Sequence, residues 1–207
     1  MKKLLTIIIV IALTAPFFTA CKKGENDPGL SIKSRTSRLT GEWELTEMER
    51  TSTSTYSGTS STSITTFNGS NMTSTSGSYT STSIYSETIE IMKDGTYKSN
   101  TNQTYTESGN IYTNSSEGTW AWVSGNKEDE YKNKERICFT TTSSTSTSSY
   151  GGSSSTSIFS ADGDNNDLYV MKIDELSSKT LVFTREYNDN DDGDTYTVSE
   201  TSTYEKK

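Results

Sequence analysis

The sequence has no histidine among its 207 residues, only two cysteines and two prolines, and a hydrophobic share of just 29%. Without histidine the chain lacks the commonest general base, the usual base of serine and cysteine nucleophile sites, and a frequent zinc ligand. The apolar share is well below the roughly 45–50% of typical globular chains, a value that also counts glycine. The hydrophobic core must therefore be small.

Basic clusters are also missing, and the net charge is −8. An acidic chain without a basic patch is a poor ligand for nucleic acid, and this class of protein is excluded. Such a composition borders on that of disordered chains, but those are poor in aromatic and β-branched residues. Here tyrosine occurs 12 times and threonine is abundant, and both favour strands, so ordered β structure is the preferred interpretation.

The N-terminus has the layout of a secretion signal. A cationic start at Lys2 and Lys3 precedes the apolar run Leu4–Leu13, and Pro16 lies before a short segment that ends at Cys21. The run is shorter than the roughly 20 apolar residues that a membrane-spanning helix needs. Residues 1–20 are therefore predicted to be a signal peptide.

The residues Phe18-Thr19-Ala20-Cys21 resemble the lipobox of bacterial lipoproteins, although Phe18 replaces the usual leucine. The resemblance implies that Cys21 is acylated and becomes the mature N-terminus, and that Lys22 directs the protein to the outer membrane. The alternative is an ordinary signal peptide that leaves Cys21 as a free thiol. The spacer Lys22–Gly29 contains no apolar residue to bury. Residues 21–33 are predicted to be a lipidated cysteine with a flexible tether.

The remainder, residues 34–207, is predicted to be one all-β domain. Apolar and polar residues alternate from Trp43, and Thr88–Lys98 is a hairpin pattern centred on Asp94-Gly95. Short turns between successive strands imply antiparallel neighbours, and a short helix near Ser34–Leu39 is the only helix expected. Further apolar strand patterns lie at Gly118–Val123, Arg136–Phe139, Leu168–Ile173, Thr180–Arg185 and Thr195–Ser199.

Three tracts consist almost entirely of serine and threonine, at Thr51–Ser63, Thr73–Ser83 and Thr140–Ser157. One interpretation is low-complexity linkers. The preferred one is long hairpin arms that continue the strands beyond the packed core, because threonine favours extended backbone. Arms of this kind need closure or twist to protect their edges from pairing with other chains.

The order of these features resembles that of the lipocalin-like domain lipoproteins of Gram-negative bacteria. Gly41-Glu42-Trp43 matches the glycine-any-tryptophan signature of the first lipocalin strand, where the tryptophan plugs one end of the barrel. The resemblance implies a closed, antiparallel, up-and-down barrel of about eight to ten strands with an interior able to hold one small ligand. It also implies that Arg185 stacks on Trp43; an exposed strand arginine is the alternative. The chain departs from classical lipocalins in lacking their threonine-aspartate-tyrosine motif and a disulfide pair.

Candidate ligand-binding residues are the large aromatic side chains expected inside the barrel, together with one cation. Because apolar residues are so few, these aromatics are more simply explained as the core than as the walls of an empty pocket. The candidates are Trp43, Tyr97, Trp120, Trp122, Phe183 and Arg185.

No cofactor or metal is predicted. The acidic stretches Asp162–Asp167 and Asn188–Asp194 concentrate oxygen ligands, but the second lacks the glutamate that ends an EF-hand loop, and solvated turns explain both. If Cys21 is acylated, Cys138 has no partner in the chain, and it is predicted to be a half-buried strand residue.

Three functions follow from the sequence. The first is a monomeric, non-catalytic, outer-membrane lipoprotein, periplasmic or surface-exposed, that binds a small or moderately apolar molecule. The second is an interaction or adhesion module whose hairpins, rich in serine, threonine and tyrosine, contact glycan or another envelope protein. The third is an enzyme, which would need a carboxylate pair such as Glu87 and Glu90 inside the barrel, and nothing in the spacing selects such a pair.

Overall fold

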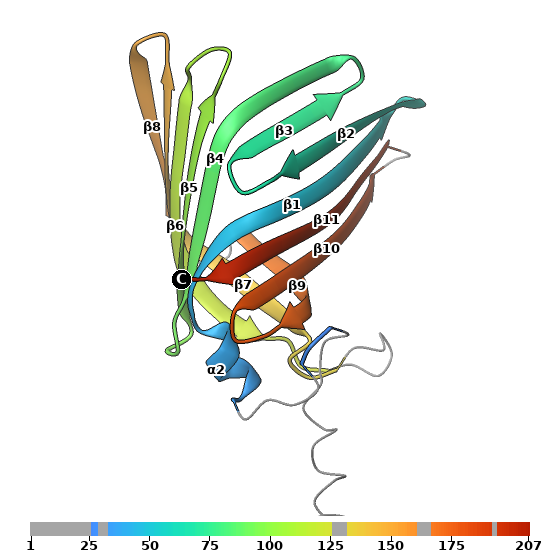
Figure 1. Cartoon of the computed structure of the whole chain (residues 1–207). Coiled ribbons are helices and arrows are strands. Elements are labelled where there is room, and N and C mark those ends of the chain that lie inside the picture. The colour runs from blue at the N-terminus through green and yellow to red at the C-terminus, as the bar shows by residue number, and fades with distance from the viewer. Residues whose placement is uncertain (1–25, 29–32, 126–131, 161–166, 192–193) are drawn as a thin grey trace, which may run out of the picture.

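The computed structural model describes residues 26–28, 33–125, 132–160, 167–191 and 194–207. This part of the chain is built from β-strands, with one short helix at one end (Figure 1). The elements are α2 (Arg35–Leu39), β1 (Gly41–Tyr56), β2 (Thr59–Phe67), β3 (Asn71–Ser76), β4 (Tyr79–Ile91), β5 (Thr96–Tyr105), β6 (Ile111–Trp122), β7 (Arg136–Tyr150), β8 (Ser153–Ser160), β9 (Asp167–Leu176), β10 (Thr180–Asp191) and β11 (Asp194–Lys206).

The strands form one antiparallel sheet that closes on itself. Its order is β6-β5-β4-β3-β2-β1-β11-β10-β9-β7-β8, and pairing of β6 with β7 closes the ring. Ten strands therefore make a closed barrel, and β8 lies beside β7 as an additional strand. The predicted fold class, an all-β antiparallel barrel with long hairpins, is confirmed.

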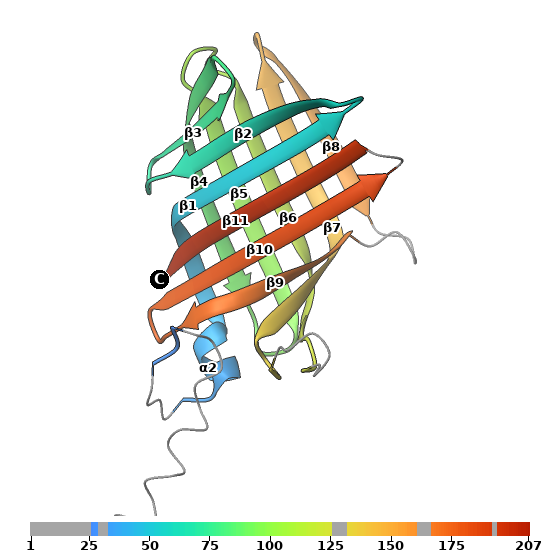
Figure 2. The same cartoon turned by 90° about the vertical axis from the view of Figure 1, so that its right-hand side faces the viewer.

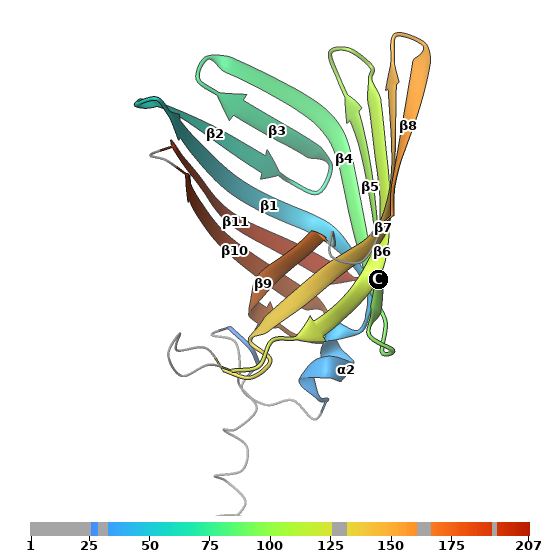
Figure 3. The same cartoon turned by 180° about the vertical axis from the view of Figure 1, so that it is seen from behind.

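The ring is narrower at one end than at the other. At the end beside α2, which we call the base, Gly41–Glu44 of β1 pairs directly with Thr88–Ile91 of β4, so only eight strands close the circle there. Further along, the β2–β3 hairpin enters between β1 and β4. On the opposite wall, β7 pairs with β9 near the base and with β8 beyond Ser143. The barrel widens away from the base, and the hairpins diverge there (Figures 2 and 3).

The hydrophobic core fills the base. Trp43, Tyr97, Phe139 and Phe183 are each at most 2% exposed, and the rings of Tyr97 and Phe183 pack edge-on against Phe139. These positions are inward because side chains alternate along each strand. Asp94-Gly95 makes the predicted turn between β4 and β5, with Gly95 at φ +89°.

The predicted helix turn is α2, which covers the base. The Ser34 side chain caps it by accepting a hydrogen bond from the Ser37 amide at 3.1 Å. Trp43 is fully buried beneath it and donates its indole N–H to the Leu39 carbonyl at 2.7 Å. The aromatic ring of the first strand therefore closes the narrow end of the barrel.

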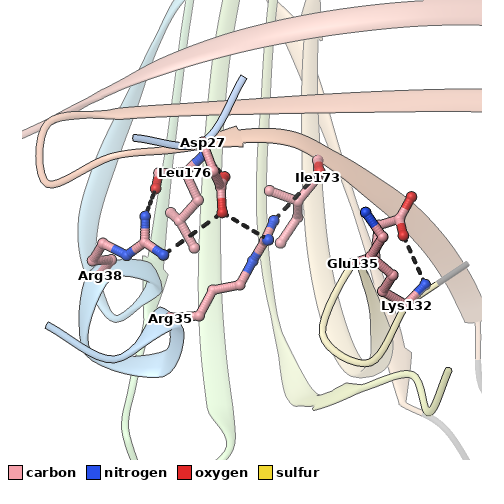
Figure 4. A network of polar contacts seen from close by, with 7 residues as sticks. All are labelled: Asp27, Arg35, Arg38, Lys132, Glu135, Ile173 and Leu176. Carbon is pink, nitrogen blue, oxygen red and sulfur yellow. Dashed lines mark hydrogen bonds and ion pairs between the residues drawn. The ribbon is translucent and has the colours of Figure 1, made fainter. Parts of the chain in front are cut away.

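Asp27, within the predicted flexible tether, is docked on the base, which corrects the expectation of a free spacer at this position. Asp27 is 3% exposed, and its carboxylate lies 2.8 Å from the Arg35 guanidinium and 3.6 Å from that of Arg38 (Figure 4). The Leu176 amide donates to the same carboxylate at 2.8 Å, while Arg38 donates to the Leu176 carbonyl. A polar segment stays free only when the rest of the fold offers its charged groups no buried partners. Here Arg35 and Arg38 are such partners for the Asp27 carboxylate.

The three serine- and threonine-rich tracts are strands, as preferred. They lie in the β1–β2, β3–β4 and β7–β8 hairpins, which we call the arms, and hydroxyl groups face one another across the strands. Ser57 and Gly58 both adopt positive φ at the tip of the first arm, which suits a tight hairpin turn. Cross-strand hydroxyl contacts include Thr53 with Thr62 at 3.1 Å, Thr65 with Ser74 at 2.9 Å and Thr147 with Thr156 at 3.2 Å.

Candidate functional site

A cavity of about 370 Å³ lies inside the barrel, above the packed base. Its deepest lining residues belong to the core: Met48, Ile89, Phe139, Met171 and Phe183. Other lining residues come from positions nearer the arms, so the cavity extends toward the wide end. Its volume falls within the range of about 300–1,000 Å³ that is usual for small-molecule sites.

Strand alternation places the functional side chains. On β4, Tyr85, Glu87 and Ile89 are two residues apart and all line the cavity, whereas Glu90 is exposed on the outer face. On β11, Glu200, Ser202 and Tyr204 line it in the same way. The remaining lining residues are Arg50, Thr65, Met72, Ser99, Thr101, Gln103, Tyr112, Tyr169 and Arg185.

Glu87 is held by two tyrosines from different walls of the barrel. The Tyr85 hydroxyl donates to Glu87 Oε2 at 2.6 Å, and the Tyr204 hydroxyl of β11 donates to Oε1 at 2.7 Å. Burial, and then the negative charge of Glu87, raise the pKa of both tyrosines well above the ordinary value. Both hydroxyls therefore stay protonated at neutral pH and remain donors to this carboxylate.

Glu200 is the second carboxylate of the cavity, and it is paired with a cation. Arg50 contacts Glu200 Oε2 through both Nε and a terminal nitrogen at 2.7 Å, and the Ser202 hydroxyl donates to Oε1 at 3.0 Å. Arg185 lies opposite Glu200 on the neighbouring strand, with its guanidinium 5.8 Å from the ring centre of Tyr187. The cavity wall thus carries two carboxylates and two guanidinium groups among aromatic and methionine side chains.

Two of the six sequence-predicted ligand residues line this cavity, namely Phe183 and Arg185. Trp43, Tyr97 and Trp120 belong to the buried core, and Trp122 packs against it. The two later tryptophans are tied to the base through their indole N–H groups, Trp120 to the Met92 carbonyl at 2.8 Å and Trp122 to the Thr36 hydroxyl at 3.0 Å. The interpretation of most of these aromatics as core agrees with the structure.

The stacking of Arg185 on Trp43 that the resemblance implied is not found. The cation over the Trp43 ring is Lys206, with Nζ 4.9 Å from the ring centre and donating to the Arg38 and Thr40 carbonyls. Arg185 faces Glu200 in the sheet register, whereas Trp43 faces Lys206. The two side chains therefore lie at different levels of the barrel.

Sequence reasoning missed most of the polar lining. Glu87 was considered only with Glu90, which the strand places on the opposite face. Arg50 and Glu200 were not singled out, although Glu200 shares the alternation of Val198, Ser202 and Tyr204. This alternation was the signal in the sequence that could have placed Glu200 on the inner face of the barrel.

The remaining predicted positions carry less information. Cys21 and most of the acidic stretch Asp162–Asp167 lie outside the described residues. Cys138 is a half-buried residue of β7, as predicted. Within the described ranges, histidine, cysteine, aspartate and glutamate side chains form no group that could hold a metal ion, and no helix is long and apolar enough to cross a bilayer.

Comparison of the chain with protein-family models, with curated proteins and with solved structures finds no match, so the lipocalin-like resemblance stays a prediction beside the barrel that the structure shows.

Proposed function

We propose that this protein is a lipid-anchored, lipocalin-like lipoprotein of the outer membrane that binds a small or moderately apolar molecule without catalysing its conversion. The observation that carries the proposal is the cavity of about 370 Å³, which combines aromatic and methionine walls with a few fixed polar groups. That combination is typical of small-molecule sites, where apolar contact supplies affinity and polar groups fix orientation. The proposal treats the protein as a monomer, since one chain closes the barrel by itself.

The proposed anchor gives the barrel an orientation. Asp27 follows Cys21 by six positions and is fixed to the base. A chain of that length spans at most about 20 Å. An acylated Cys21 would therefore keep the base close to the bilayer, with the cavity mouth and the arms directed away from it.

Acylation is tested by Cys21→Ala, with Cys138→Ala as the matched control. The first variant should lose the mass of the acyl chains and leave the detergent phase, while the control keeps both. A Cys21→Ala protein that still partitions with membranes would contradict the anchor.

Ligand binding is tested by native mass spectrometry of protein purified from its own host. We expect a retained small molecule that is lost in Thr101→Phe, whose added ring enters the cavity. Asn100→Phe, on the exposed face of the same strand, should keep it. Two results together would contradict the proposal: native mass spectrometry detects no bound molecule, and neither Thr101→Phe nor Asn100→Phe changes the binding of added apolar dyes.

A second candidate function, adhesion through the arms, is favoured by one observation. Each serine- and threonine-rich arm carries an exposed tyrosine beside its turn: Tyr56 is 72% exposed, Tyr79 65% and Tyr150 74%. Exposed tyrosines among small hydroxyl residues suit adaptable recognition of polar surfaces. Replacement of these three tyrosines by serine should abolish binding on a glycan array or to envelope extracts, while Thr101→Phe leaves it intact; the reverse pattern would assign recognition to the cavity.

A further inference from the structure

The two carboxylates of the cavity differ in their partners. Glu200 is neutralised by Arg50 at 2.7 Å. Glu87 has no cation within 4 Å among the described residues, and both of its oxygens instead accept hydrogen bonds from tyrosine hydroxyls. A hydroxyl donor fixes the carboxylate in place but does not compensate its charge. The cavity therefore contains a positioned carboxylate that forms no ion pair among the described residues.

Aromatic rings line the cavity that holds this carboxylate. Two of them, Tyr85 and Tyr204, are its hydrogen-bond donors, and Phe183 packs edge-on against Tyr204 at 5.8 Å between ring centres. The faces of such rings attract cations and repel anions. The other aromatic lining residues are Tyr112, Phe139 and Tyr169.

Arg185 is the cation of the cavity wall that has no carboxylate within 4 Å among the described residues. Arg185 is partly exposed, and its guanidinium lies over Tyr187, which does not line the cavity and is 42% exposed. Arg50 is already occupied by Glu200. The surroundings of Glu87 thus suit a cation, because its carboxylate has two tyrosine partners and no ion pair. The positive charge of Arg185 belongs to a level of the barrel farther from the base, opposite Glu200.

We propose that the cavity takes a small organic cation, in which an ammonium group lies against Glu87 and an apolar body packs on the surrounding rings and methionines. The proposal rests on the small-molecule function proposed above and specifies its ligand class. An ammonium donates to carboxylate lone pairs that the tyrosines leave open, and its charge balances that of Glu87. An apolar body then gains contact with Met48, Met72 and Met171, which adapt readily to the shape of a ligand.

The test uses three probes of nearly equal shape and different charge: phenethylamine, 2-phenylethanol and 3-phenylpropanoate. Binding of each to the mature chain is measured by calorimetry or by chemical-shift changes. We expect phenethylamine to bind about ten-fold more tightly than 2-phenylethanol, and 3-phenylpropanoate to bind most weakly, since only the ammonium adds an opposite charge to its hydrogen bond with Glu87. This comparison needs no substitution and so does not depend on the folding of a variant.

Glu87→Gln should then remove the preference for phenethylamine over 2-phenylethanol. Glu90→Gln, on the outer face of the same strand, is the matched control and should keep it. Arg185→Gln should strengthen phenethylamine binding, because it removes a like charge from the cavity wall. Thermal unfolding of each variant establishes that the barrel is intact.

Equal affinities for phenethylamine and 2-phenylethanol, or a preference that survives Glu87→Gln, would overturn the cation proposal and leave the cavity as a site for another ligand class. Failure of all three probes to bind would also overturn it. The small-molecule function itself would fail only if, in addition, native mass spectrometry found no retained ligand.

Discussion

The base and the arms of this barrel are made of the same kind of sheet but are stabilised differently. At the base, large side chains from facing strands fill the interior, and Trp43, Tyr97 and Phe139 are almost fully buried. In the arms, serine and threonine occupy both faces, and the contacts across the strands are hydroxyl pairs such as Thr55 with Ser60 at 2.9 Å. The packed base therefore sets the register in which the strands pair. The arms continue that pairing and need no core of their own.

The largest difference between the two regions is expected for removal of a large side chain. Trp43→Ala should lower the free energy of unfolding by about 3–5 kcal/mol, because it leaves a cavity where the base is closed. Tyr150→Ala, at an exposed arm tip, should change it by less than about 0.5 kcal/mol. Urea unfolding of both variants measures the contrast, and similar losses would show that the arms contribute to the cooperative core.

Alkaline pH should act mainly on the interior. Burial raises the pKa of Tyr85, Tyr169 and Tyr204 in the fold. The folded protein thus keeps these phenol protons after the unfolded chain has begun to lose them near pH 10, so this contribution to stability is present below pH 10 and declines above it. Between pH 9 and pH 11, ionisation of each of these tyrosines in the unfolded chain should lower the free energy of unfolding by about 1 kcal/mol.

Urea titrations at these two pH values measure the loss, and Tyr85→Phe should make it smaller. Exposed Tyr56→Phe is the control and should leave the pH dependence as it is in the unaltered chain. A loss that Tyr85→Phe does not reduce would show that this phenol makes no contribution.

Gly118→Ala should have an intermediate effect at the base. A Cβ at this position would lie 2.0 Å from the Thr140 carbonyl oxygen on β7 and 2.9 Å from the Tyr97 ring, next to the irregularity in the β6–β7 pairing. Since neither the backbone nor a buried ring moves easily, we expect a loss of about 1–3 kcal/mol. Gly109→Ala is the control for a glycine with open space around its Cβ, and its loss measures only the backbone strain of a side chain at φ +68°. Equal losses would show that the barrel adjusts at Gly118.

Shortening an arm should have the smallest effect. Removal of residues 147–150 and 153–156 deletes four paired residues from each strand and keeps Gly151-Gly152 as the turn, joined to Ser146 and Ser157. An even number on each side preserves which face every remaining residue occupies. The free energy of unfolding should change by less than about 0.5 kcal/mol. A large loss would show that the β7–β8 arm supports the barrel.

Much of this fold could be predicted because its signals are local. The alternation from Trp43, the Asp94-Gly95 turn and the short helix near Ser34–Leu39 each depend on a few neighbouring residues. The serine- and threonine-rich tracts were also predictable as arms, since the preference of threonine for extended backbone needs no distant partner.

The candidate site was less predictable because its members come from distant parts of the chain. Tyr204 reaches Glu87 across 117 positions of sequence, and Arg50 pairs with Glu200 across 150. Alternation along β4 assigns Glu87 to the same face as the buried Ile89. It does not show which strands of the barrel lie opposite that face. The expected Arg185–Trp43 stacking failed for this reason, since the level of each side chain depends on the register of the closed sheet.

By itself, the sequence determined that this chain forms antiparallel strands, where many of them turn and that its core is small, since backbone preference and side-chain alternation act over a few residues. Only the tertiary structure decided that eight strands close at the base and ten above it, that Asp27 is buried between two arginines, and that Glu87 lies in the cavity with no cation of the described residues within 4 Å. Those features depend on which strands meet when the sheet closes, and no local interaction specifies that.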